Sequence, residues 1–257
     1  MEIKIDFTKS AQENAEEYYA KAKREARRVE GAKKALLELQ KMLDEEGRKS
    51  EVKSKPRVKT LRKREWYERF HWFYTKEGML AIGGRDAHQN EKLNADYFGD
   101  ADLFFHADIF GASVVILKDG TKSGNDSRIE VAQFAASYSS AWENMQKSVD
   151  VYCMRREQVS KATSKGSLGT GSFLLSGERE WYRNTQLGLV AYIEKGVMHV
   201  APALAANRLA AKEYAIISQG QKKKSDAAKE LAKRLGYDDL DYIMQQLPAG
   251  SFSIDFK

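Results

Sequence analysis

The sequence predicts an α+β protein, in which a mixed β-sheet domain with packed helices is preceded by a long helix of the coiled-coil type. Apolar residues recur with a period near 3.5 over residues 9–46, a pattern typical of a coiled-coil helix. Over residues 63–215, short apolar and aromatic runs that end at glycines alternate with amphipathic stretches, which predicts strands with intervening helices. We therefore expect a helical arm with a basic linker at 1–62, the α+β domain at 63–215, and a short helical tail at 216–257.

The helical arm carries an apolar seam that needs a partner. At about 1.5 Å per residue, a helix of this span reaches on the order of 55 Å. A lone helix with such a seam buries nothing, so we expect self-association, a helix of another protein, or a partner segment of the same protein. Eight of the nine seam positions are apolar or aromatic, with Glu25 the exception: Ala15, Tyr18, Ala22, Glu25, Val29, Ala32, Leu36, Leu39 and Leu43.

The remaining elements follow from periodicity and from turn residues. Asp86 is the expected N-cap of the first helix in the α+β domain. The predicted strands and helices are a hairpin at 70–74 and 79–82, a helix from 86 to 93, strands at 102–106 and 112–117, an amphipathic helix at 128–142, strands at 149–159 and 173–175, a hairpin at 187–193 and 197–200, a helix at 203–214, and tail helices at 225–235 and 238–247.

Composition narrows the class of protein. The 257 residues are 42% hydrophobic and 11% aromatic, enough for a substantial core. The single cysteine, Cys153, excludes an internal disulfide and cysteine-based zinc sites, and no histidine pairs with it or with another histidine at zinc spacing. No run of about 18 apolar residues is present, so we expect a cytoplasmic protein that binds no membrane, metal or cofactor.

The distribution of charge indicates a polyanionic partner. The net charge is +6. Residues 20–64 hold 17 Lys and Arg against 7 Asp and Glu, and within 47–64 nine basic residues face only Glu51. A basic block beside a mildly acidic body is the usual mark of a protein that binds nucleic acid, although a solvated helix or linker is the alternative.

The stretch Gly166-Ser-Leu-Gly-Thr-Gly-Ser172 resembles a nucleotide-binding loop but fits neither known pattern. A P-loop requires Lys where Ser172 stands, and a dinucleotide-binding loop requires Gly where Leu174 stands. Two interpretations remain. The loop is either a glycine-rich turn before a strand, or a loop whose bare amides approach an RNA backbone.

Two side-chain groups are candidates for chemistry or binding. His106 and Asp108 are two residues apart, so on a continuing strand they share a face and could form a general base with its orienting carboxylate, although such pairs more often satisfy a turn. Aromatic residues 66–74 lie beside several arginines, an arrangement that can stack bases and neutralise phosphates. Because Phe70, Trp72 and Tyr74 can alternate inward on a strand, we expect at most two of the five aromatics to be exposed. Cys153 is expected in the core.

Five ordered blocks resemble the NFACT family of ribosome-associated quality-control proteins, in its C-proximal RNA-binding domain. They are Trp66-Tyr-Glu-Arg-Phe-His-Trp-Phe73, Gly78-Met-Leu-Ala-Ile-Gly-Gly-Arg-Asp-Ala-His-Gln-Asn-Glu91, His106-Ala-Asp-Ile-Phe-Gly-Ala-Ser113, Gln158-Val-Ser-Lys161 and Gly169-Thr-Gly-Ser-Phe173. The arm, with Asn14-Ala-Glu-Glu-Tyr-Tyr19, looks like the returning half of the family's middle coiled coil. Three residues depart from the family pattern: His71, Phe110 and Glu180.

The resemblance implies a function for the chain. Members of the family bind a large ribosomal subunit that carries peptidyl-tRNA, recruit tRNA, and support tailing of the stalled chain through an N-terminal domain that this sequence does not match. We therefore expect an RNA-binding module for tRNA and ribosomal RNA, not an enzyme. The alternatives are an RNA-processing enzyme using His106 and Asp108, or a cell-surface adhesin, a label that some bacterial relatives carry. The candidate RNA-binding residues are Arg64, Arg69, Arg85, Asp86, His106, Asp108, Gln158, Ser160, Lys161, Lys165, Gly169, Gly171 and Ser172.

Overall fold

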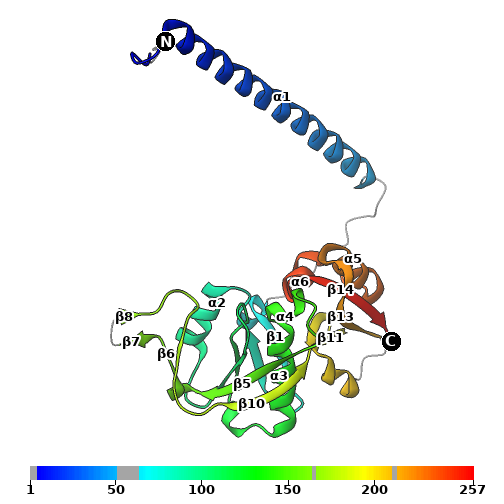
Figure 1. Ribbon diagram of the computed structural model, residues 1–257. Helices are drawn as coiled ribbons and strands as arrows, with labels where there is room; N and C mark the ends of the chain where they lie inside the picture. Colours follow the sequence, from blue (N-terminus) through cyan, green and yellow to red (C-terminus); the bar gives the residue numbers. More distant parts are fainter. Residues whose placement is uncertain (1–4, 51–63, 164–165, 210–212) are drawn as a thin grey trace. The chain divides into compact units, whose positions relative to one another are not determined.

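The computed structural model describes residues 5–50, 64–163, 166–209 and 213–257. The chain forms two compact units that meet in sequence at Lys63 and Arg64, and each is described by itself (Figure 1). The α+β class is confirmed: a long helix makes up most of the first unit, and sheets with helices make up the second.

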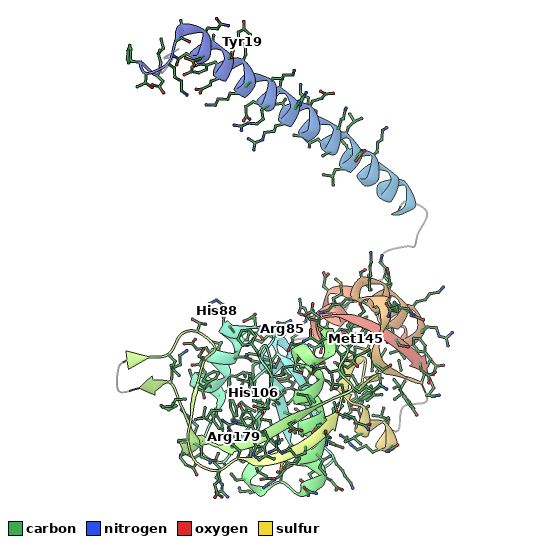
Figure 2. All side chains as sticks on the ribbon, viewed as in Figure 1. Tyr19, Arg85, His88, His106, Met145 and Arg179 are labelled. Atoms are coloured by element: carbon green, nitrogen blue, oxygen red, sulfur yellow. The ribbon has the colours of Figure 1, made fainter. Side chains whose placement is uncertain are left out.

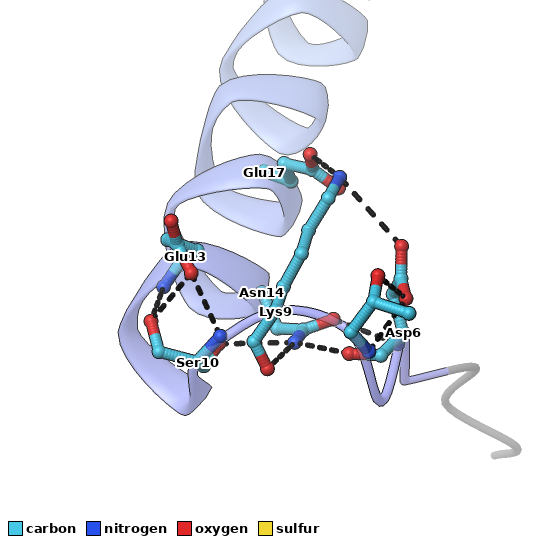
Figure 3. A network of polar contacts seen from close by, with 7 residues as sticks. Asp6, Lys9, Ser10, Glu13, Asn14 and Glu17 are labelled. Atoms are coloured by element: carbon cyan, nitrogen blue, oxygen red, sulfur yellow. Dashed lines mark hydrogen bonds and ion pairs between the residues drawn. The ribbon is translucent and has the colours of Figure 1, made fainter.

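The arm is the 40-residue helix α1, Ala11–Ser50, and its start is closed by side chains (Figure 3). Ser10 and Glu13 form a reciprocal cap, in which Glu13 N donates to Ser10 Oγ over 3.2 Å and Ser10 N donates to Glu13 Oε2 over 2.7 Å. Asn14 is buried and binds the preceding loop, with its Oδ1 accepting from Asp6 N over 2.9 Å. Val29 and Leu36 on the seam are 54% and 64% exposed, so the described part of this unit leaves the seam uncovered.

Two antiparallel sheets build the second unit. The larger sheet has the strand order β1-β2-β4-β3-β5-β10, and the smaller has the order β12-β11-β13-β14. Where we expected a mixed sheet, every pairing between described strands is antiparallel. The strands are β1 His71–Tyr74, β2 Leu80–Gly83, β3 Leu103–Ala107, β4 Val115–Leu117, β5 Ser148–Arg155, β10 Glu180–Gln186, β11 Leu189–Glu194, β12 Val197–Pro202, β13 Tyr214–Lys223 and β14 Ser251–Phe256.

Short helices and a small excursion complete the unit. Between β5 and β10 the chain forms β6, which pairs with β9, and β7, which pairs with β8 at the outer end of the excursion (Figure 1). The helices and short strands are α2 Ala87–Lys92, α3 Asn125–Ser137, α4 Ser140–Glu143, β6 Val159–Ser160, β7 Ala162–Thr163, β8 Gly166–Ser167, β9 Leu174–Leu175, α5 Lys224–Leu235 and α6 Leu240–Gln246.

The core lies around α3. One face of the larger sheet, including Phe73, Phe105 and the expected core residue Cys153, packs on α3 together with the smaller sheet and the C-terminal helices. Burial raises the pKa of the Cys153 thiol to about 12, so it stays protonated at neutral pH. The opposite face of the sheet carries a second cluster that includes Phe104, Tyr152 and Met154.

The helix predicted at 128–142 is divided into two. The helix α3 ends at Ser137, and α4 starts afresh with Ser139 as N-cap. We expected an amphipathic helix, but α3 is buried on most sides, and its buried polar residues pair with groups on neighbouring elements. Glu130 pairs with Arg208 over 2.9 Å, and Gln133 Nε2 donates to the Gln186 carbonyl over 3.2 Å.

The C-terminal third differs most from the prediction. The helix expected at 203–214 is a 3-10 helix at Ala203–Arg208, and the strand β13 begins at Tyr214. That strand crosses the expected boundary at 215, and it joins β11 to β14. Both tail helices are confirmed as α5 and α6, but the tail also contributes β14, which the sequence patterns did not predict.

Candidate nucleic-acid interface

Three aromatic rings form a row across one face of the larger sheet. His106 on β3 lies opposite Tyr152 on β5, and Tyr152 lies opposite Trp181 on β10. Side chains at register partners point to the same face, which explains the row. The ring centroids of His106 and Tyr152 are 5.7 Å apart, and those of Tyr152 and Trp181 are 5.5 Å apart. His106 and Trp181 are half-buried, so both rings remain in part accessible to a ligand.

Two arginines cover this aromatic row. The Arg179 guanidinium lies 4.5 Å from the centroid of Tyr152, and the Arg183 guanidinium lies 3.9 Å from the centroid of Trp181. Each also has an acidic neighbour: Arg183 binds Asp150 over 2.6 Å, and Arg179 lies 4.0 Å from Asp108. Stacked guanidinium groups keep their edges free to donate to phosphates or to base edges. In the view of Figure 2, His106 and Arg179 both lie below Arg85.

His106 and Asp108 do not form the pair that the alternative enzyme hypothesis requires. The ring atom Nδ1 of His106 lies 3.3 Å from the Tyr152 hydroxyl, whereas Asp108 is exposed and faces Arg179. Among the hydrogen bonds between described side chains, none joins His106 to Asp108. Burial lowers the pKa of His106 below its usual value, so the ring is neutral at physiological pH and serves as a flat, uncharged surface.

The glycine loop is anchored to α2. Lys161 Nζ binds Glu91 Oε2 over 2.7 Å, and the backbone amide of Gly171 donates to the same oxygen over 3.4 Å. Gly171 has a φ of +77°, and a Cβ there would lie 2.9 Å from the Cβ of Ala87. Lys161 is therefore held within the protein, and it does not extend freely toward a ligand. The glycine at 171 is required by its backbone conformation and its close packing.

The other predicted loop residues have structural contacts or lie at the surface. Gln158 fixes the base of the excursion, where its Oε1 accepts from Arg155 N over 2.8 Å and its Nε2 donates to the Glu178 carbonyl over 2.7 Å. Ser160, Gly169 and Ser172 are exposed. Lys165 lies outside the described residues.

The residues predicted near the start of the unit are spread over several elements. Arg64 binds Asp239 over 2.8 Å, and Arg69 packs over Tyr97, so both contact surface elements. Asp86 caps α2, with its Oδ1 accepting from Gln89 N over 2.8 Å, as predicted. These three residues and Arg85 do not join the aromatic row.

The expectation for the early aromatics is confirmed. Trp66 and Tyr74 are exposed by 44% and 41%, whereas Phe70 and Trp72 are buried. Trp66 stacks on Tyr97 with ring centroids 4.6 Å apart.

Sequence reasoning missed Arg179, Trp181 and Arg183. They are two residues apart, a period that places all three on one face of a strand, and this is the signal that could have found them. It was missed because β10 was not predicted: its seven residues, EWYRNTQ, are mostly polar, and the strand lies at an edge of the sheet.

Comparison with known proteins identifies the domain that carries this site. Residues 69–177 match the NFACT protein RNA binding domain. The chain carries the RNA-binding domain of the NFACT family. The match includes His106 and Tyr152, and Arg179 and Trp181 follow it by a few residues.

Relatives of the NFACT chain are found in archaea and animals. It is 35% identical over 205 residues to the archaeal Rqc2 homolog aRqcH of Methanocaldococcus jannaschii, and this alignment covers 76% of this chain and 30% of the relative. It is 33% identical over 192 residues to the ribosome quality control complex subunit NEMF homolog of Drosophila melanogaster, and this alignment covers 72% of this chain and 19% of the relative. The chain thus spans less than a third of the length of these relatives.

A solved structure is also similar. The C-terminal part of the fibronectin/fibrinogen-binding protein from Streptococcus suis aligns with a TM-score of 0.40 and 20% identity, covering 56% of this chain and 55% of that one.

The described residues carry neither a metal-binding cluster nor a membrane-spanning helix. No group of three or more His, Cys, Asp or Glu side chains there is arranged to hold a metal ion. None of the helices described is both long enough and apolar enough to cross a membrane.

Proposed function

We propose that this NFACT domain binds unpaired RNA, from tRNA or from ribosomal RNA of the large subunit, through the row formed by His106, Tyr152 and Trp181. The observation that carries the proposal is the alignment of these three rings across β3, β5 and β10 under Arg179. Bases in RNA loops and ends are recognised by stacking on aromatic rings and on guanidinium planes. A sheet face suits this role, because its cross-strand spacing leaves His106 and Trp181 partly accessible on either side of the buried Tyr152, which lies under Arg179.

The chemistry of the face agrees with a single-stranded ligand. The Trp181 ring is half-buried and therefore partly accessible, and Arg179 and Arg183 beside it supply donors for phosphates. Stacking of one base on one aromatic side chain contributes about 1–3 kcal/mol. The nearby Asp108 and Asp150 hold the arginines in place and reduce the net positive charge, so we expect this face to depend more on stacking than on charge.

The wider assignment is to ribosome quality control. Relatives are named as subunits of the ribosome quality control complex, and the resemblance in the sequence implies binding to stalled large subunits. The basic residues of 20–64 would add a second, mainly electrostatic contact, whose strength falls with salt. We propose that the chain is the RNA-contacting part of such a factor and acts without catalysis.

The test is binding of purified tRNA and of large ribosomal subunits across a salt series, with duplex DNA as the control ligand. Trp181→Ala should weaken RNA binding about 5- to 150-fold, which corresponds to about 1–3 kcal/mol, whereas Trp181→Phe should keep most of the affinity. Arg179→Ala should also weaken it, and Lys229→Ala, an exposed change of equal charge on α5, should not.

The variants also separate this proposal from its competitors. If Trp181→Ala and Arg179→Ala bind RNA like the unmodified chain, the aromatic row is not the interface. If the chain degrades RNA and His106→Ala stops the degradation while binding persists, the enzyme hypothesis replaces it.

A further inference from the structure

A second site lies away from the aromatic row, in a pocket between the start of α2, α4 and the C-terminal helices. Its volume is about 990 Å³. The pocket is lined by two basic side chains, Arg85 and Lys224, and by the buried His71, and Figure 2 shows Arg85 at this end of the unit. Apolar residues of the segment after α6, among them Leu247 and Pro248, form another part of its wall.

The cations of the pocket lack partners of opposite charge. The Arg85 guanidinium makes no hydrogen bond or ion pair with any described residue, and the Asp86 carboxylate, which caps α2, acts on it only through its electrostatic field. Lys224 Nζ donates to the Leu247 carbonyl over 2.8 Å, a neutral acceptor. Glu143 and Asp241 also line the pocket, but neither forms an ion pair with Arg85 or Lys224 among the described residues.

Burial and a neighbouring cation show that positive charge gathers in this pocket. Burial lowers the pKa of Arg85 and of Lys224, and the charge of Arg85 lowers the pKa of Lys224 further, whereas Asp86 offsets part of the effect of burial on Arg85. The first two residues of the 12-residue helix α5 line the same pocket, and a helix start adds positive potential. Together they favour an anion.

His71 adds a buried, unsatisfied polar atom to the wall of the pocket. It is 5% exposed and lines the pocket, and its Nδ1 has no hydrogen-bond partner among the described residues. Its ring stacks on Tyr138 with centroids 3.9 Å apart, which fixes its orientation. A buried polar atom without a partner costs stability unless water or a ligand satisfies it.

The rim adds a surface for a base. Phe110 is 98% exposed at the edge of the pocket, so its ring is kept in water rather than in the core. The Ser140 hydroxyl donates to the Phe110 carbonyl over 2.6 Å and ties this loop to α4. An exposed ring beside a cationic pocket matches a ligand with a flat apolar part and an anionic part.

We propose that this pocket binds one nucleotide of RNA, an end or an extruded residue, with its phosphate at Arg85 and Lys224 and its base against Phe110. This inference rests on the proposed RNA-binding function and adds a second site to it. The aromatic row would hold a run of bases, and the pocket would hold a single phosphate-bearing nucleotide. A nucleoside monophosphate is therefore the smallest ligand that the pocket should accept.

The experiment titrates the full chain with AMP, adenosine and inorganic phosphate by calorimetry or NMR. AMP should bind saturably and more tightly than either fragment. Arg85→Gln and Lys224→Gln should each weaken AMP binding about 10-fold or more, because each removes a charge-assisted contact. Lys223→Gln is the matched control, since it removes the same charge from an exposed neighbour. Phe110→Ala, at a residue too exposed to affect folding, should weaken AMP but not inorganic phosphate.

The results that would overturn the proposal are equally specific. Absence of AMP binding, equal affinity for AMP and inorganic phosphate, or equal weakening by Lys223→Gln would each refute the nucleotide pocket. Trp181→Ala should leave AMP binding unchanged. If the unmodified chain binds AMP but not RNA, only the aromatic interface is refuted, and if it binds RNA but not AMP, only the pocket is refuted.

Discussion

The two glycines at the end of the glycine loop should respond in opposite ways to the same substitution. Gly171 has a φ of +77°, and its added Cβ would lie 2.9 Å from the Cβ of Ala87 and 3.2 Å from its Cα. A Cβ at Gly169 would meet no atom within 4 Å. Alanine at 171 is therefore strained in both backbone and packing, whereas alanine at 169 is not.

The magnitude follows from these two contributions. A left-handed conformation costs a non-glycine residue about 1–2 kcal/mol. Overpacking against the rigid start of α2 adds about 1–3 kcal/mol, and the lower entropy of the unfolded alanine chain offsets about 0.4–1 kcal/mol. The net cost for Gly171→Ala is therefore about 3 kcal/mol, within a range of about 1–4.6 kcal/mol, and Gly169→Ala should be neutral or slightly stabilising.

The assay must report on the loop rather than on the whole protein. The loop is held to α2 by the ion pair of Lys161 with Glu91, and within the loop Ser172 N donates to the Gly169 carbonyl over 3.1 Å. Hydrogen exchange of the Ser172 amide should therefore accelerate by about 30-fold or more in Gly171→Ala, because a free-energy change of about 2 kcal/mol corresponds to this factor. Equal protection of this amide in Gly171→Ala and Gly169→Ala would refute the reasoning.

Two further predictions concern protonation and the arm. Burial, and the positive charges of Arg85 and Lys224, lower the pKa of His71 well below its usual 6.5, so the unfolded chain takes up a proton first as the pH falls. The contribution of neutral His71 to the free energy of unfolding is complete above about pH 6.5 and decreases below it, by about 1.4 kcal/mol per pH unit until the folded pKa is reached. Denaturant unfolding from pH 7 to 4 should therefore show a weaker decrease of this free energy with falling pH in His71→Phe, and the decrease that remains should come from His106. An equal decrease in His71→Phe and the unmodified chain would contradict this account. Ser10→Ala removes the oxygen that accepts from Glu13 N, so it should destabilise α1 by about 1 kcal/mol and lower its helix content, as measured by circular dichroism. Thr8→Ala lies outside the cap and should leave the helix content of α1 unchanged.

Local patterns in the sequence determined much of this protein. The period of 3.5 predicted α1, the Gly-terminated aromatic runs predicted β1 and β2, and Asp86 was recognised as an N-cap, because each of these features depends on residues near one another in the chain. The family blocks pointed to an RNA-binding domain for the same reason, since their spacing is written in the sequence. The three-part division of the chain stays a prediction.

The tertiary structure decided where the candidate site lies. His106 was a candidate from the sequence, but Tyr152 and Trp181 join it only through strand pairing. Tyr152 lies 46 residues after His106, and Trp181 lies 29 residues after Tyr152, so no local pattern encodes their contact. The strand β10 was missed because a polar edge strand lacks the alternation of apolar residues that periodicity detects. The helix expected at 203–214 was overridden because strand pairing to β11 and β14 gave Tyr214 and the residues after it more hydrogen bonds and burial than a helix would.

Lys161 shows the same limit for function. In the sequence it is a cation beside glycines, and it suggested a phosphate contact, but packing of the loop on α2 brings it to Glu91. Conversely, His71 and Phe110 stood out in the sequence only as departures from the family pattern, and Lys224 carried no motif. They form a pocket with Arg85 only because β1, α4 and α5 converge there. The sequence by itself determined which residues could bind an anion, and the tertiary structure decided which of them still have charge to offer, because pairing within the fold uses up some cations and burial leaves others without a partner.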